Sequence, residues 1–362
     1  MKRFTLIILF FISTMSITTA SASSLTVIDM ADRKVDVPFD PARIICIGPG
    51  TLRLIVYLNA QDKISGVEDM EKSNSVGRPY WIANPELQDL PRCGPGGPTS
   101  INKKPDLEAV MSVSPDVIFV TYMDRDLADE VQATLGIPIV VLSYGTFSNF
   151  DETVFSSLKL AGKILNRERR AEDLVSYITS LKKDLNDRTA NIPASKMPRV
   201  FVGGIGYRGS YGIESTEKDY IPLEWLNAIN LAEQVEGRIG DHVLVDKETM
   251  LKLDPDVIFI DGGGLALVEE DYNKKKDFYK ALKAVKNRQV FMLFPFNWYT
   301  TNIETAMADA YAIGKILYGE RFKDIDPEKK ADEIYTFMVG KPVYKDMEKD
   351  HGKLGVIAPF LK

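Results

Sequence analysis

Two stretches of the sequence decide the fold: residues 108–120 read EAVMSVSPDVIFV, and residues 248–260 read ETMLKLDPDVIFI. Both contain Pro-Asp-Val-Ile-Phe, and in both a glutamate stands seven residues before the proline. Each stretch predicts a short amphipathic helix that ends at the proline and leads into a buried strand. The copies are 140 residues apart, which is too far for a solenoid repeat and fits two similar lobes in tandem. Chance is the alternative, because Pro-Asp is common between a helix and a strand.

Other apolar, β-branched runs predict further buried parallel strands, and helical patterns separate them. These runs cover residues 43–47, 137–142, 199–203 and 289–293. Each lobe is therefore expected to be α/β. The 340 residues after position 22 also exceed the usual size of a single hydrophobic core, which again favours two lobes.

A long helical stretch separates the two lobes. Residues 151–165 predict one amphipathic helix, and residues 167–188 predict a second helix that Asn166 could cap. The second helix would be about 33 Å long, the diameter of a small domain. We therefore expect two Rossmann-like α/β lobes joined by a single long spanning helix, with little hinge closure. The expected boundaries are 23–150 for the N-terminal lobe, 151–197 for the connecting helices, 198–340 for the C-terminal lobe and 341–362 for a tail.

The first residues predict export from the cytoplasm. Lys2 and Arg3 precede an apolar run at residues 4–15, and residues 20–22 read Ala-Ser-Ala, so residues 1–22 are expected to be a cleaved signal peptide. A membrane anchor is the alternative, although the run is short for a membrane span. The first cysteine is Cys46, so no lipid anchor is expected. The expected location is the periplasm.

Composition excludes some classes of partner and metal site. The net charge of −6 argues against a nucleic-acid partner. The chain has only two histidines, His242 and His351, whereas a bare zinc or manganese site usually needs more imidazoles close together. Cys46 and Cys93 could form one disulfide in an oxidising compartment, or they could remain two half-buried free thiols. No cofactor is expected, and the sequence does not identify a set of metal ligands.

The order of these features resembles the helical-backbone periplasmic binding proteins of ABC importers. The residues that carry the resemblance are RIICIGP at 43–49, LPRCG at 90–94, PDLE at 105–108, the two Pro-Asp strands, and LAGKIL at 160–165 followed by Arg-Glu at 167–168. The resemblance covers residues 25 to about 340. It implies a monomer that carries a small-molecule metal complex to a permease dimer in the inner membrane. A ferric siderophore or similar Fe(III) complex is favoured, and cobalamin, haem, molybdate and tungstate are alternatives.

Ligands of open α/β sheets gather beyond the carboxyl ends of the strands, and this rule nominates the loops that follow each predicted strand. Arginines there could neutralise an anionic ligand through forked donors. Tyrosine and tryptophan offer flat faces to a ring-bearing ligand, and a phenolate oxygen could ligate ferric iron. The expected ligand-binding residues are Thr51, Arg53, Tyr122, Tyr144, Tyr207, Arg208, Asp261, Trp298 and Tyr299. For each of them a structural role in its loop is the alternative.

The sequence favours a binding protein over an enzyme. It contains no G-x-S-x-G, H-E-x-x-H or P-loop motif, and neither histidine lies in a catalytic context. A periplasmic chelatase-like enzyme is the alternative class. The resemblance also implies that one acidic residue on each lobe docks onto the permease, and Glu108 and Glu248 occupy the matching positions. Their alternative role is to stabilise the starts of their helices.

Overall fold

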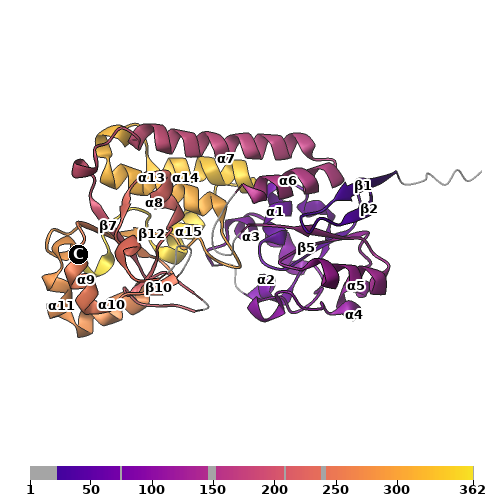
Figure 1. The fold of residues 1–362 in the computed structure, drawn as a ribbon, viewed down its shortest axis with the longest axis horizontal. Coiled ribbons are helices and arrows are strands. Elements are labelled where there is room, and N and C mark those ends of the chain that lie inside the picture. Colours follow the sequence, from indigo (N-terminus) through magenta and orange to yellow (C-terminus); the bar gives the residue numbers. More distant parts are fainter. Residues whose placement is uncertain (1–22, 74–75, 146–151, 208, 238–241, 362) are drawn as a thin grey trace, which may run out of the picture.

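The computed structural model describes residues 23–73, 76–145, 152–207, 209–237 and 242–361. The expected signal peptide at residues 1–22 and the expected ligand residue Arg208 lie outside the described residues. The described chain forms two α/β lobes side by side, and one long helix runs along both of them (Figure 1). The expected fold class, two α/β lobes joined by a long spanning helix, is confirmed.

Each lobe contains a four-stranded parallel sheet, and the two sheets have the same strand order. The first sheet is ordered β4-β3-β5-β6, and the second is ordered β12-β11-β7-β9. Their strands are β3 (Ile44–Ile47), β4 (Ile64–Gly66), β5 (Val117–Thr121) and β6 (Ile139–Leu142), then β7 (Arg199–Gly203), β9 (Ile229–Asn230), β11 (Val257–Asp261) and β12 (Val290–Leu293). In each sheet the chain reverses its direction of travel across the sheet between the two central strands. In open α/β sheets, ligands bind at the carboxyl ends of the strands beside such a switch point.

The repeated Pro-Asp motif joins the first and third strands of each sheet. The Asp116 carboxylate accepts a hydrogen bond from the backbone N–H of Arg43 at 2.8 Å. In the second lobe the Asp256 carboxylate accepts one from the backbone N–H of Arg199 at 2.9 Å. Each aspartate therefore satisfies a backbone donor at the start of the neighbouring strand, where the sheet itself supplies no acceptor. The predicted helix-to-strand repeat is present in both lobes.

Two helices lead from the first lobe to the second. They are α6 (Thr153–Ile164) and α7 (Glu168–Thr189), close to the predicted ranges. The prediction that Asn166 caps α7 is wrong. Asn166 adopts a left-handed conformation with φ 55°, and the N-cap residue is Arg167, which makes no side-chain capping bond. The tight turn between the helices needs the left-handed residue, which asparagine tolerates.

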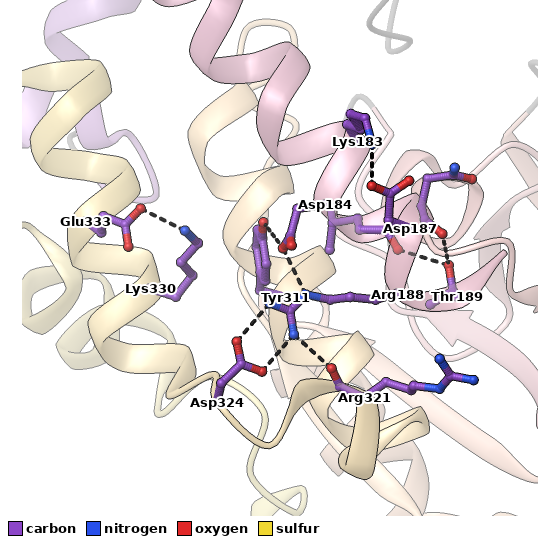
Figure 2. A network of polar contacts seen from close by, with 12 residues as sticks. Lys183, Asp184, Asp187, Arg188, Thr189, Tyr311, Arg321, Asp324, Lys330 and Glu333 are labelled. Atoms are coloured by element: carbon purple, nitrogen blue, oxygen red, sulfur yellow. Dashed lines mark hydrogen bonds and ion pairs between the residues drawn. The ribbon is translucent and has the colours of Figure 1, made fainter. Parts of the chain in front are cut away.

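The C-terminal end of α7 is fastened to the second lobe by a polar network (Figure 2). Both Nη atoms of Arg188 pair with the two carboxylate oxygens of Asp324, at 2.7 and 2.8 Å. Its Nε donates to Asp184 at 2.9 Å, and Tyr311 also donates to Asp184 at 2.8 Å. A two-pronged arginine–carboxylate pair fixes orientation as well as distance, so this end of the helix is held in one position.

Helices near the C-terminus make the connection broader than α7 alone. Helices α13 (Ile303–Leu317) and α14 (Pro327–Val339) pack against each other, and α14 also contacts helices of the first lobe. One continuous hydrophobic core includes Tyr57 of the first lobe, Leu174 of α7 and Tyr335 of α14. Because the lobes share this core, large independent movement would expose apolar surface to water.

The remaining elements complete the two lobes and their edges. The strands are β1 (Ser24–Ile28), β2 (Lys34–Pro38), β8 (Ser215–Glu217) and β10 (His242–Leu244), which form the antiparallel pairs β1-β2 and β8-β10. The helices are α1 (Thr51–Tyr57), α2 (Asp69–Ser73), α3 (Pro79–Ala83), α4 (Leu107–Ser112), α5 (Arg125–Leu135), α8 (Ile221–Trp225), α9 (Lys247–Leu253), α10 (Leu265–Lys274), α11 (Lys276–Ala281), α12 (Lys283–Lys286) and α15 (Tyr344–His351). Within the described ranges, no helix combines the length and apolarity that a membrane span requires.

Cys46 and Cys93 are free and buried, so the disulfide alternative is not adopted. Side chains alternate between the two faces of a strand, and along β3 this places Cys46 and Ile45 in different core clusters. Cys93 belongs to the cluster of Ile45. The two sulfurs therefore pack on opposite faces of the first sheet.

Candidate functional site

The two lobes meet at the carboxyl ends of their sheets. The segment after β12, residues 294–302, crosses to the first lobe, and we call it the interlobe loop. Tyr299 and Thr300 in this loop have left-handed backbone conformations, with φ 48° and 70°. Such a conformation is costly for a β-branched threonine and persists only where the surroundings enforce it. The contacts of this loop with the first lobe supply such surroundings.

Arg53 is the main tie between the lobes. It is fully buried, and its Nε donates to Asn302 Oδ1 at 2.9 Å. Its Nη1 donates to the Thr301 carbonyl at 3.0 Å, and its Nη2 donates to the Trp298 carbonyl at 2.7 Å. The guanidinium also lies over the Tyr80 ring, 4.8 Å from its centroid. Arg53 was expected to bind ligand, but its donors are committed to the interlobe loop.

Tyr299 makes a second cross-lobe contact. Its hydroxyl donates to Glu68 Oε2 at 2.9 Å and accepts from the backbone N–H of Gly97 at 2.9 Å. Glu68 also accepts from the backbone N–H of Gly48 at 3.1 Å. Burial raises the pKa of Glu68 to about 7, and the Tyr299 hydrogen bond opposes this rise. The Glu68 carboxyl group is therefore neutral in a large share of molecules near neutral pH.

Three other expected ligand residues stabilise the first-lobe side of this interface. Thr51 is buried, and its hydroxyl contacts the Ile47 carbonyl at 2.8 Å and Thr121 Oγ1 at 3.0 Å. Tyr144 is buried behind Arg53. The Tyr122 hydroxyl lies 3.5 Å from Thr300 Oγ1, across the interface. Thr51 and Tyr144 thus have a structural role, whereas Tyr122 lines the seam between the lobes.

Arg78 and Trp298 form a cluster of unused donors at the interface, which we call the interlobe donor cluster. Arg78 is fully buried, and its Nη1 donates to Glu71 Oε2 at 2.7 Å. Among the described residues, no acceptor reaches Arg78 Nε, Arg78 Nη2 or Trp298 Nε1, although all three atoms are buried. The guanidinium lies 5.8 Å from the centroid of the Trp298 ring and 5.1 Å from that of Trp81. The Arg78 donors come from the first lobe, and the Trp298 donor comes from the second lobe.

The second lobe places its remaining candidates apart from this cluster. Asp261 ends β11, and its carboxylate accepts from the backbone N–H of Gly263 at 2.8 Å. Burial raises the pKa of Asp261 to about 7. Tyr207 is 39% exposed and stacks on His242 with ring centroids 4.8 Å apart. Tyr207 is therefore an exposed aromatic side chain, whereas Asp261 is a buried acid with a raised pKa.

Across the described ranges, no three His, Cys, Asp or Glu side chains are grouped so that they could hold a metal ion. The donor cluster instead provides N–H groups, which bind oxyanions. Sequence reasoning missed Arg78 because it does not directly follow a strand. The only local signal was Gly-Arg-Pro at residues 77–79, in an irregular segment of the first lobe.

A family model described as periplasmic binding protein matches residues 44–295. The chain belongs to this family. The two-lobed structure with its helical connection is the fold of the family's solved members, so the predicted resemblance is confirmed. This periplasmic binding protein is therefore the extracytoplasmic ligand-binding component of an ABC transporter.

The names of individual relatives give different ligands. The molybdate-binding protein MolA of Haemophilus influenzae is 26% identical over 357 residues, covering 92% of this chain and 96% of that protein. The structure of MolA bound to molybdate has a TM-score of 0.68 at 22% identity, covering 88% of this chain and 98% of that one. The heme uptake protein IsdE of Staphylococcus aureus is 24% identical, covering 65% of this chain and 79% of its own. The petrobactin-binding protein YclQ of Bacillus subtilis has a TM-score of 0.58 at 17% identity, covering 82% and 99% of the two chains.

Proposed function

We propose that this periplasmic binding protein captures a small tetrahedral oxyanion, such as molybdate or tungstate, between its lobes and delivers it to an ABC permease. The observation that carries the proposal is the interlobe donor cluster. A buried donor without an acceptor costs about 1–3 kcal/mol, and more when it is charged. Arg78 Nε and Nη2 form one edge of a guanidinium, which suits two oxygens of a single anion. Trp298 Nε1 adds a donor from the other lobe.

The surroundings of the cluster favour a compact anion. Arg53 and Tyr299 join the lobes directly, so a ligand between the lobes must fit beside these contacts. The Glu71 carboxylate pairs with Arg78 through Nη1 and leaves the Nε–Nη2 edge to an anion. The name of the relative that is 26% identical over 92% of this chain supports the same ligand class.

A ferric siderophore or other metal chelate, the ligand favoured from the sequence, is the second candidate. It is supported by the exposed Tyr207 ring, which stacks on His242 at the carboxyl end of the second sheet. A ring-bearing chelate could extend this stack. The names of the heme and petrobactin relatives support the same candidate.

Delivery requires contact with the permease, and we assign this contact to Glu108 and Glu248. Both side chains are exposed near the starts of α4 and α9, the two helices of the internal repeat. The helices begin alike, since Asp106 and Asp246 each cap their own helix. One acid on each lobe would match a permease with two related subunits, and complementary charge would set the rate and register of docking.

The ligand is tested by calorimetric titration of the purified protein with sodium molybdate and, separately, with a ferric siderophore. Trp298→Phe keeps the ring and removes its N–H group, so molybdate affinity should fall by about tenfold to a hundredfold. Arg78→Lys keeps the positive charge and removes the paired N–H donors of the guanidinium, so it should also weaken molybdate binding. Arg92→Lys is the matched control, because Arg92 also pairs with a carboxylate but is half exposed at the surface. Siderophore binding with no response to molybdate would overturn the oxyanion proposal in favour of the chelate.

A further inference from the structure

The C-terminal segment, residues 341–361, is an integral part of the second lobe rather than a tail. Within it, α15 packs against α14, and Tyr344 and Met347 are buried. The chain then runs antiparallel to β12, with backbone hydrogen bonds from Met292 to Val356 and from Ala358 to Val290, both at 2.9 Å. The pairing along β12 and the half-buried helix fix the short turn between them. Figure 1 shows α15 in the middle of the molecule, close to where the lobes meet.

This segment places His351, the last residue of α15, at the seam. A Cβ atom on Gly77 of the first lobe would lie 3.2 Å from His351 Nε2, and a Cβ on Gly262 of the second lobe would lie 3.1 Å from His351 Cβ. Two glycines, one from each lobe, therefore leave the space that the histidine occupies. His351 Nε2 is buried, and within the described residues it has no hydrogen-bond partner.

His351 packs against the backbone next to the interlobe donor cluster. Gly77 is the residue before Arg78, so the imidazole lies against the backbone that positions the guanidinium. A crevice of about 780 Å³ separates the first lobe from α15. Its walls include Trp81, on which Arg78 stacks, and Asp350, which precedes His351.

We propose that His351 is a further ligand-binding residue, and that the C-terminal segment delivers its Nε2 to the oxyanion held by Arg78 and Trp298. The inference rests on the proposed function. This inference gives the C-terminal segment a role in ligand capture. The sequence predicted only a tail at residues 341–362. The three residues would then supply buried nitrogen donors from three separate parts of the chain.

This arrangement makes capture depend on pH. Burial lowers the pKa of His351 and the Asp350 carboxylate opposes the shift, so the free protein holds a neutral imidazole near pH 7. Asp350 is the charged group that acts on the imidazole. Arg78, which is paired with Glu71, follows Gly77, and Asp261 precedes Gly262, on the two segments packed against His351. An oxyanion at Nε2 favours the imidazolium, which takes its proton from solvent. Binding therefore takes up a proton, and affinity rises as the pH falls.

The test is calorimetric titration with sodium molybdate between about pH 5 and 8, the range in which a histidine changes charge, in two buffers of different protonation enthalpy. The wild-type protein should bind more tightly at the lower pH and take up protons. His351→Gln should bind about tenfold or more weakly, with a flat pH profile. His242→Gln is the matched control and should keep the wild-type profile, because its imidazole is engaged by Ser215 and Tyr207.

A second measurement, on protein that retains His351, tests the inference even if His351→Gln fails to fold. The chain has two histidines, so their Cε1–H NMR signals are distinguished with His242→Gln alone. Saturating molybdate should raise the apparent pKa of the His351 signal. If the His351 pKa does not move and His351→Gln keeps both affinity and pH slope, the inference is overturned. Loss of binding in Trp298→Phe would still support the proposed function in that case. If the wild-type protein does not bind molybdate, both fail together.

Discussion

Replacing Arg53 tests whether the lobes are held by one buried cation. Arg53→Met keeps an unbranched chain of similar length and removes every donor. The substitution leaves the Trp298 and Thr301 carbonyls without the bonds that Arg53 supplies at 2.7 and 3.0 Å. It also removes the positive charge that lies near the buried Glu304 carboxyl group.

The expected loss of unfolding free energy is large. Each hydrogen bond from a charged donor contributes about 1.5–3 kcal/mol, and a desolvated cation over an aromatic ring adds about 2 kcal/mol. Methionine recovers part of this loss through apolar packing. A net loss of about 3–5 kcal/mol is expected, which is the usual cost of removing one partner from a buried charged network.

The assay is urea unfolding, followed by tryptophan fluorescence, with slope and midpoint fitted together. Arg43→Met is the matched control, because Arg43 also donates to backbone carbonyls, those of Val113 and Ser114, but is exposed. Its loss should stay below about 1 kcal/mol. Equal losses for the two variants would refute the assignment of Arg53 as the interlobe tie.

Four further predictions address pH, docking, thiols and lobe movement. The pKa of Asp261 is raised to about 7 on folding, so its stabilising contribution is complete below about pH 4 and is lost as the pH rises through 7. The melting temperature should therefore fall over this pH range, and Asp261→Asn should make the fall smaller. Asp324→Asn is the control and should leave the fall unchanged, because the pKa of Asp324 is lowered. Reversing both charges at Glu108 and Glu248 should leave ligand affinity within about twofold and abolish uptake into membrane vesicles, and normal uptake would locate docking elsewhere. In the absence of reductant, both cysteine thiols should react with a thiol reagent once the protein is unfolded, and not before. A reaction that requires reductant would show that the two cysteines form a disulfide. X-ray scattering should show little change in radius of gyration on ligand binding, since the lobes share a core, and a large fall would contradict the stiffness of α7.

The family resemblance was readable from the sequence because its signals are local. A stretch of about a dozen residues is enough to predict a helix that ends at Pro-Asp and a strand that begins with Val-Ile-Phe. The second copy of this stretch predicts a second lobe. The length of α7 follows from its apolar spacing in the same way. Asn166 was assigned as a cap on residue preference alone, and the turn it adopts between α6 and α7 depends on how the two helices pack.

The strand-end rule located the interface, but it did not distinguish residues that bind ligand from residues that join the lobes. Arg53 has the chemistry of an anion-binding residue, yet its donors are used by the Trp298, Thr301 and Asn302 groups of the other lobe. Whether an arginine is free or engaged depends on acceptors that are more than 240 residues away in the chain. No local pattern encodes that distance.

The sequence by itself determined the two α/β lobes, their helical connection and the family, because backbone periodicity and turn chemistry act over short spans. Only the tertiary structure decided the rest of the candidate site, because Trp298 alone was nominated by the strand-end rule. Arg78, Trp298 and His351 are far apart in the sequence, and none stands in a motif. Their importance comes from being buried with donors or ring nitrogens that no described neighbour satisfies. Burial without a partner is a property of packing, and it exists only once both lobes and the C-terminal segment have come together.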